Sequence, residues 1–356
     1  MKKLYKDIRF TKGILTLTAG LLIAGCSAED ELGNNSSAQQ LNMIPMVNDL
    51  QKSRANDEDA LHEKTLSKLD FKMFEPEFGK CCVNHQSSSP AENQAEVLGK
   101  NNWKVDLNLQ EDHSYNYYAV ANAQADLSKK TLEELQAATQ QDNDIWQPYP
   151  QAKDKKFLMS AKGQYIISKD PIQDIPVELV RAAAKIKLNL SSSVNGYNIT
   201  NVKWKFLNYN TNTSVFAGQT AKPNIESNNE DNTVDKIEAN KCSVTTYSYS
   251  TTWTSQEDAP KIAVKVVFQS KDNKNDTREK ELTIPVRDPK GEKKLERNYI
   301  YTVNADIKRL KDDINIDYDE ELGYLKWAIT KWTTGEDTEV DADKASYLVV
   351  YPTTLD

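Results

Sequence analysis

The chain has 356 residues and a formal net charge of −8 at pH 7. This length is sufficient for two domains of ordinary size. The acidic balance and the lack of a Lys/Arg run exclude a basic surface of the kind that binds nucleic acid, so we expect no nucleic-acid partner.

The first 26 residues predict an exported lipoprotein. Basic residues precede an apolar run that starts at residue 14 and ends in Ile23-Ala24-Gly25-Cys26. This ending is a bacterial lipobox, in which the cysteine thiol takes a diacylglycerol before cleavage, whereas an ordinary secretory signal has no fixed cysteine. A transmembrane anchor is the alternative, but the run is shorter than the ~20 residues that span a bilayer. We therefore expect Cys26 to hold the protein on outer-membrane lipid through its acyl chains.

Residues 27–54 are polar apart from one short apolar island, LNMIPMV. The island has the length of a strand, with Leu41, Met43 and Val47 on one side. A very polar segment that contains Arg54 follows. A trypsin-like protease could cut there, although a single arginine in a loop is equally consistent with the pattern.

From residue 66 onward, apolar residues recur at every second position, as in half-buried strands with one solvated face. Polar turns separate many such segments, which argues for β-sandwiches. The expected strands carry Leu69, Phe71 and Met73; Trp103, Val105, Leu107 and Leu109; the segments from Tyr115, at 157–160 and at 164–168; Ile186, Leu188 and Leu190; Val202, Trp204 and Phe206; residues 261–268 and 281–286; and Tyr299, Tyr301, Val303 and Ile307.

One helix is expected at residues 131–139, where Thr131 and Glu134 have the spacing of a capping box. The polar stretches 79–100 and 208–240 are expected to be mostly loop. The long strand pattern that ends at Leu190 contains a joint, which places the domain boundary near Arg181.

Cys81, Cys82 and Cys242 remain besides the lipobox cysteine. Three cysteines define no closed disulfide framework, so their state stays open. Cys81, Cys82 and His85 have the composition of a metal half-site, but adjacent side chains point apart and no second ligand pair follows. We therefore expect no metal site.

The C-terminal tail contains two strand-like segments behind acidic linkers. The first is GYLKWAITKW, in which Leu325, Trp327 and Ile329 alternate before Trp332, and the second is SYLVVYPTTLD at residues 346–356. The simplest interpretation is two edge strands that close the last sandwich.

Four segments together resemble the fimbrillin family, the type V pilins of Gram-negative gut and oral anaerobes. They are the lipobox, ELVRAAAKIKLNL at 178–190, ERNYIYTVNADI at 296–307 and AITKW at 328–332. In addition, KSRAND is similar to the processing site of short-fimbria subunits, with Arg54 before Ala55.

The resemblance implies an all-β fold of two transthyretin-like β-sandwiches with one short helix and a C-terminal donor-strand appendage. The implied divisions are a signal peptide at 1–26, a propeptide with a removable first strand at 27–54, sandwiches at 55–180 and 181–310, and appendage strands at 311–356.

The resemblance also implies a structural subunit of a cell-surface fimbria that supports adhesion. A surface Arg-specific protease would cut between Arg54 and Ala55, which removes the first strand from the N-terminal sandwich. A donor strand of an identical or related subunit would fill the groove, so the protein would move from the surface of the outer membrane into the fimbrium. The implied donor residues are Leu325, Trp327, Ile329 and Trp332. The long segment at 346–356 departs from the ending of short-fimbria subunits, so the resemblance leaves open which of the two terminal segments is the donor.

A second interpretation is a surface lipoprotein, or a fimbrial tip adhesin, that binds a glycan or protein receptor. Tyr247, Tyr249 and Trp253 would then form a sugar-stacking platform, although an ordinary strand explains the same alternation. The retained donor pattern favours a stalk subunit over a tip, and Arg54 argues against an anchor subunit. The sequence contains no hydrolase, metalloprotease or nucleotide-binding motif, so we expect no enzyme and no cofactor.

Overall fold

The computed structural model describes residues 39–47, 63, 65–88, 103–107, 109–148, 156–170, 172–286, 292–310 and 326–331. The chain divides into two compact units, Met1–Ser36 and Ser37–Asp356, and all described residues lie in the second. They form β-sheets joined by the short helix α2 (Leu132–Gln136) and the 3-10 turn η2 (Gln256–Asp258), which confirms the all-β prediction. Among these residues, no helix combines the length and hydropathy needed to cross a membrane.

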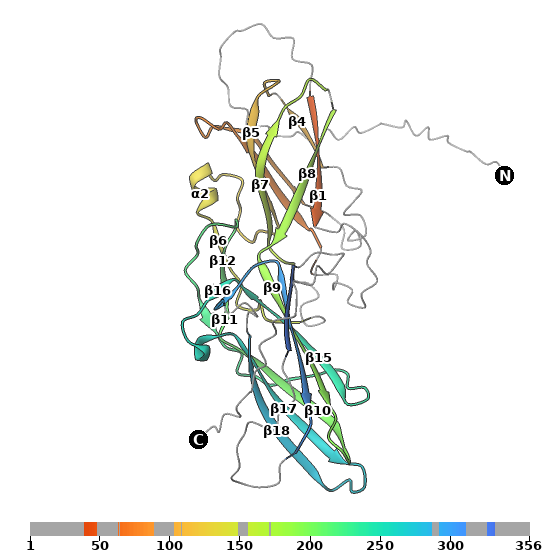
Figure 1. The fold of residues 1–356 in the computed structure, drawn as a ribbon. Coiled ribbons are helices and arrows are strands. Elements are labelled where there is room, and N and C mark those ends of the chain that lie inside the picture. Colours follow the sequence, from red (N-terminus) through yellow and green to blue (C-terminus); the bar gives the residue numbers. More distant parts are fainter. Residues whose placement is uncertain are drawn as a thin grey trace, which may run out of the picture. The chain divides into compact units, whose positions relative to one another are not determined.

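The first sandwich contains, within the described residues, strands in the order β3-β2-β5-β7-β8-β1-β4 (Figure 1). β7 and β8 pair only at Met159↔Arg181 and Ser160↔Val180 in this part of the chain, so the sheet divides there into two layers. The strands are β1 (Gln39–Val47), β2 (Lys68–Phe74), β3 (Cys81–Ser88), β4 (Trp103–Leu107), β5 (Ser114–Ala121), β7 (Met159–Ile166) and β8 (Ile172–Arg181).

The β2 strand is buried on both of its faces. Leu69, Phe71 and Met73 are buried as predicted, but Lys72, expected on a solvated face, is only 3% exposed. The reason is that the segment around α2 covers this face, and Lys72 Nζ donates to the backbone oxygen of Ser128 at 2.8 Å. The prediction of a solvated face was therefore wrong for β2.

The capping box predicted for the helix is present. The Glu134 backbone N–H donates to Thr131 Oγ1 at 3.3 Å, and the Thr131 N–H donates to Glu134 Oε2 at 2.9 Å. These bonds satisfy two N–H groups that the first turn otherwise leaves unpaired.

The prediction of a loop over residues 79–100 was wrong for residues 81–88, which form β3. This strand is antiparallel to β2 at the edge of the sheet and carries Cys81, Cys82 and His85. Neither of these two cysteines forms a disulfide with another described residue. An edge strand pairs on one side only, so its sequence can remain polar and lacks the alternation that identifies a half-buried strand.

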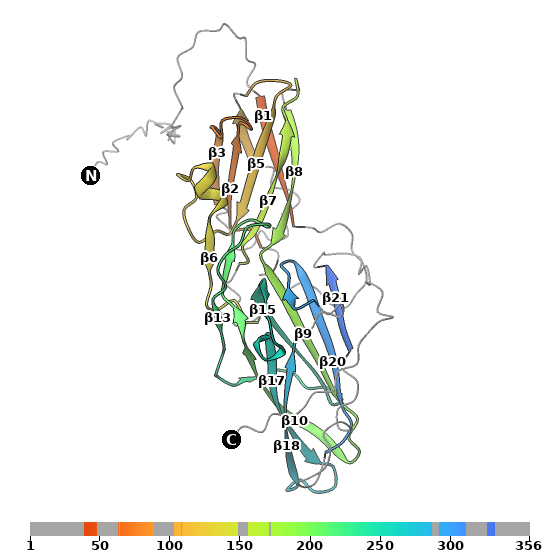
Figure 2. The ribbon, with the colours of Figure 1, turned by 60° about the vertical axis from the view of Figure 1, so that its left-hand side comes forward.

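The second sandwich consists, in the described residues, of sheets in the orders β14-β10-β17-β18 and β13-β11-β15-β9-β20-β21 (Figure 2). The predicted inward residues Val202, Trp204 and Phe206 are buried, as are Ile186 and Leu188. The strands are β9 (Ala183–Ser192), β10 (Tyr197–Leu207), β11 (Tyr209–Asn210), β13 (Ile225–Glu226), β14 (Asn232–Thr233), β15 (Lys241–Tyr249), β17 (Lys261–Ser270), β18 (Thr277–Pro285), β20 (Tyr299–Ile307) and β21 (Lys326–Lys331).

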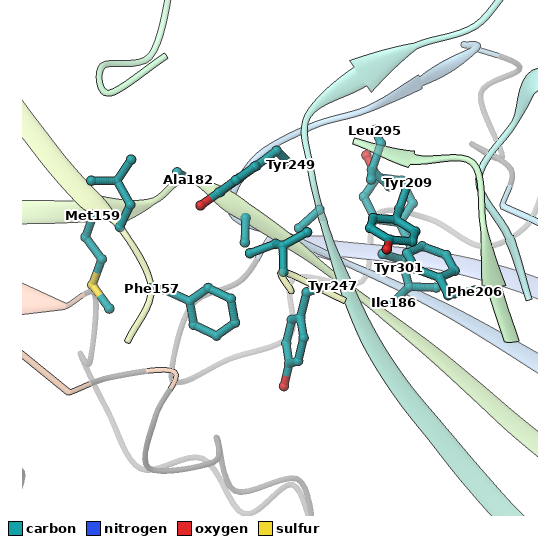
Figure 3. Close-up of a cluster of buried hydrophobic side chains, with 14 of the residues drawn as sticks. Phe157, Met159, Ala182, Ile186, Phe206, Tyr209, Tyr247, Tyr249, Leu295 and Tyr301 are labelled. Atoms are coloured by element: carbon teal, nitrogen blue, oxygen red, sulfur yellow. The ribbon is translucent and has the colours of Figure 1, made fainter. Parts of the chain in front are cut away.

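The two sandwiches share one buried apolar cluster (Figure 3). β8 ends at Arg181 and β9 begins at Ala183, so a single strand-to-strand joint connects them. Close to this joint, the rings of Phe157 and Tyr247 lie 4.9 Å apart. Two small ladders complete the fold, β6 (Thr139–Gln141) with β12 (Asn212–Ser214) and β16 (Thr251–Thr252) with β19 (Lys294–Leu295).

Candidate functional site

The strand expected to be removable, β1, lies between two neighbours. It runs parallel to β8 from Gln40↔Ile172 to Val47↔Leu179 and antiparallel to β4 from Gln39↔Leu107 to Met43↔Trp103. Leu41, Met43 and Val47 all belong to this strand. If β1 left the sheet, β8 and β4 would each lose the backbone hydrogen bonds of one ladder.

The β8 strand beside this position carries buried apolar side chains, Ile175, Val177 and Leu179. A strand that occupies the β1 position therefore helps to cover a hydrophobic core, and each large apolar side chain kept from water contributes about 1.5–3 kcal/mol.

The ladder between β1 and β8 contains two prolines at neighbouring positions. Ile44 lies opposite Pro176, and Pro45 lies opposite Val177. Proline has no backbone N–H, so each removes a possible donor from a ladder. Among the described strands, β4 pairs with β1 only as far as Met43. The C-terminal part of β1 is therefore its more weakly held part.

The segment expected to act as donor forms an edge strand of its own sandwich. β21 is antiparallel to β20, from Asn304↔Lys326 to Tyr299↔Lys331, and ends the strand order of the sheet. It contains Trp327 and Ile329, whereas Leu325 and Trp332 lie outside the described residues. Because β21 has one neighbour among the described strands, its departure would break one of the described ladders.

The residues expected to be chemically modified lie outside the described part of the chain. These are the lipidation residue Cys26 and the processing pair Arg54 and Ala55. Among the described residues, no group of three or more His, Cys, Asp or Glu side chains could hold a metal ion.

No protein-family profile matches the chain, and no curated protein sequence does. Solved structures do match. A candidate cell adhesion protein from Parabacteroides distasonis aligns with a TM-score of 0.56 at 16% identity, over 83% of this chain and 96% of that chain. A fimbrilin from Porphyromonas gingivalis aligns with a TM-score of 0.53 at 13% identity, over 84% and 99%. The tip fimbrial protein of Porphyromonas gingivalis, solved with a C-terminal truncation, aligns with a TM-score of 0.51 at 15% identity, over 83% and 100%.

The chain has a fimbrillin-like fold. The sequence motif ERNYIY, which carried part of the resemblance, has a defined structural role in it. Arg297 Nη2 donates to the backbone oxygen of Ser214 at 2.7 Å and to Thr213 Oγ1 at 2.9 Å. Asn298 adopts a φ of 61° and donates its N–H to the Ala183 oxygen at 2.8 Å. The motif therefore ties the start of β20 to β12 and to the joint between the sandwiches.

Burial lowers the pKa of Arg297 to about 10. The guanidinium nevertheless stays charged at neutral pH, so its hydrogen bonds to β12 are charge-assisted. β12 pairs with β6 in the register Thr213↔Gln140. Arg297 consequently stabilises the β6–β12 ladder, which joins segments distant in the sequence.

A second polar cluster at the joint escaped the sequence analysis. Glu63 lies beside Lys185 and Tyr247, and its backbone oxygen accepts a hydrogen bond from Arg181. Arg181 and Lys185 both belong to the ELVRAAAKIKLNL segment that resembles the family. The charged residues in this otherwise apolar strand were a usable signal, because a buried charge requires a partner.

The sugar-stacking platform proposed for the alternative function is contradicted. Tyr247 and Tyr249 are each 1% exposed, and Trp253 is 8% exposed. β15 lies inside its sheet between β11 and β9, and packing around the joint covers its tyrosines. Burial accordingly raises the pKa of Tyr249 strongly. These rings belong to the core of the fimbrillin-like fold and offer no stacking surface.

Proposed function

We propose that the protein is a structural subunit of a cell-surface fimbria, exported as a lipoprotein, cleaved after Arg54 and polymerised by donor-strand exchange. The observation that carries the proposal is the position of β1 between β8 and β4, in the segment that precedes Arg54. A cut after Arg54 separates this internal strand from the rest of its sandwich. The names of the solved structures with the same fold, a fimbrilin and a tip fimbrial protein, support the proposal.

The physical basis is competition for one position in the sandwich. Removal of β1 leaves unpaired backbone on β8 and β4 together with an uncovered apolar core. A donor strand supplies both hydrogen bonds and alternating apolar side chains. The segment 323–332 has nearly the length of β1 and contains no proline, whereas β1 contains Pro45. The incoming strand can therefore donate an N–H at the position where β1 cannot.

The proposed partners follow from the same scheme. They are identical or related subunits, an Arg-specific surface protease, outer-membrane lipid through Cys26 before processing, and an adhesion receptor of the assembled fimbria. The retained C-terminal segment supports a stalk role. The burial of Tyr247, Tyr249 and Trp253 removes the platform on which the separate glycan-binding function depended.

The deciding experiment is replacement of Arg54 by Ala in the producing cell, with Lys52→Ala as the matched control. We expect surface material of the wild type and of Lys52→Ala to begin at Ala55 and to form ladders on gentle electrophoresis. The Arg54→Ala protein should keep its lipidated N-terminus and remain monomeric. Polymer whose subunits still begin at Cys26 would contradict the proposal.

A further inference from the structure

Glu63 is completely buried, although it lies only nine residues after Arg54 in the sequence. Its carboxylate lies 2.9 Å (Oε1) and 3.0 Å (Oε2) from Lys185 Nζ, and Tyr247 OH donates to Oε1. Arg181 Nε donates to the Glu63 backbone oxygen at 2.7 Å. The side chain and the main chain of this residue are thus both held.

The residues that hold Glu63 lie outside the ladders of β1, although one of them, Arg181, is the last residue of β8. Lys185 of β9 and Tyr247 of β15 lie directly opposite each other in their ladder. Arg181 pairs with Met159 of β7. The ladder of β1 ends earlier on β8, at Leu179. Removal of β1 therefore leaves these residues with their own supporting strands.

The chain after Glu63 continues to be held until β2 begins. Asn122 Nδ2 donates to the Thr65 backbone oxygen at 2.8 Å, and the Ser67 N–H donates to Asn122 Oδ1 at 2.9 Å. Leu66 between them is buried. Among the described residues that follow β1, the contacts of Glu63 are thus the first of a series that leads into the sandwich.

We propose that Glu63 is the anchor at which the retained chain begins, so that everything before it can be cut or withdrawn without releasing β2. The role of this anchor in assembly rests on the proposed fimbrial function, whereas the contacts that hold Glu63 exist in the folded chain whatever its function. Val47 pairs with Leu179, and Glu63 binds Arg181, so residues 48–62 connect two points at the same end of β8. A cut after Arg54 then leaves only residues 55–62 between the new N-terminus and the anchor.

The charges around Glu63 favour its staying bound. Lys185 is 6% exposed and Arg181 is completely buried. If Glu63 left, Lys185 would lose the Glu63 carboxylate and Arg181 would lose the Glu63 backbone carbonyl. A buried charge that loses its partner is strongly unfavourable. The segment should accordingly stay docked on the timescale of strand exchange.

Limited proteolysis of the full chain with trypsin tests the anchor, because Lys64 directly follows Glu63. We expect cleavage of the wild type at Arg54 or Lys52 and protection at Lys64, which gives a resistant fragment that begins at Ala55 or Ser53. In Glu63→Gln, cleavage after Lys64 should become at least about tenfold faster and yield a fragment that begins at Thr65. Glu77→Gln, at an exposed turn, is the matched control and should behave as the wild type.

A second variant keeps the test decisive if Glu63→Gln fails to fold. Tyr247→Phe removes one hydrogen bond to the carboxylate and should accelerate cleavage after Lys64 by a smaller factor. The anchor is wrong if wild-type Lys64 is cut as fast as Arg54, or if the folded variants are cut at Lys64 at the wild-type rate. Protection at Lys64 combined with surface material that does not begin at Ala55 would retain the anchor and reject the Arg54 processing proposal.

Discussion

Arg297 donates from Nη2 to the backbone oxygen of Ser214 at 2.7 Å. Ser214 lies in β12, whose neighbour in its ladder is β6, and the Ser160 hydroxyl donates to the adjacent Val215 oxygen at 2.7 Å. The guanidinium therefore stabilises a segment of the second half of the chain that pairs with strands of the first half.

Replacement of Arg297 by Lys should lower the free energy of unfolding by about 2 kcal/mol or more. An ammonium cannot reproduce the planar fork of donors that reaches Ser214 and Thr213, and hydrogen bonds to charged groups contribute about 1.5–3 kcal/mol each. The measurement is a urea unfolding midpoint. Arg278→Lys, which affects a partly exposed pair with Asp276, is the control and should change stability by less than about 1 kcal/mol. Equal effects would contradict the assigned role of Arg297.

Replacement of Gly163 by Ala should destabilise the first sandwich by about 1 kcal/mol or more. A Cβ at this position would lie 2.8 Å from the ring of Tyr117, which packs against Phe71 at a centroid distance of 6.1 Å. Overpacking of this kind forces neighbouring side chains to move. Thermal unfolding measures the loss, and the same change in a Tyr117→Leu background should have a clearly smaller effect. An identical loss in both backgrounds would show that the contact is not responsible.

Replacement of Cys26 by Ala should abolish incorporation of a labelled fatty-acid analogue into the protein. The lipobox makes this thiol the acceptor of the diacylglycerol, so no other cysteine should be labelled. Cys82→Ser, at a half-buried thiol of β3, is the control and should leave labelling intact. Undiminished labelling of the Cys26→Ala protein would reject the lipoprotein assignment.

Deletion of residues 323–356 should leave an exported, folded and processed monomer that does not polymerise. In the described part of the chain, β21 is an edge strand with one neighbour, so its loss breaks one ladder of the second sandwich while the proposed donor is removed. Trp327→Asp should act in the same direction, because an unpaired charge in an apolar groove is strongly unfavourable. Circular dichroism and gentle electrophoresis measure folding and assembly.

A shorter deletion, of residues 346–356, distinguishes the two tail segments. It should retain assembly if 323–332 is the donor and abolish assembly if the last segment is. An unfolded or unexported 323–356 deletion would place the tail within its own sandwich, and persistent ladders would mean that another contact holds the polymer.

The sequence by itself determined the strands whose pattern is local. β10 and β17 alternate in sequence and in burial, with Val202, Trp204 and Phe206 inward, because a pleated strand directs successive side chains to opposite faces. The capping box at Thr131 was equally readable, since both partners lie within one turn. The order of short motifs was sufficient to predict the fimbrillin-like fold.

Only the tertiary structure decided what covers each face and which distant charges meet. Lys72 is buried because residues near Ser128 lie over β2, and Tyr247 is part of the core because its strand lies inside a sheet. Glu63 meets Lys185 across 122 positions of sequence, a separation that no periodicity reports. The alternation of apolar and polar residues indicates that a strand has two different faces. Which group lies against each face, whether water, a helix or a carboxylate, depends on how segments distant in the sequence fold onto it.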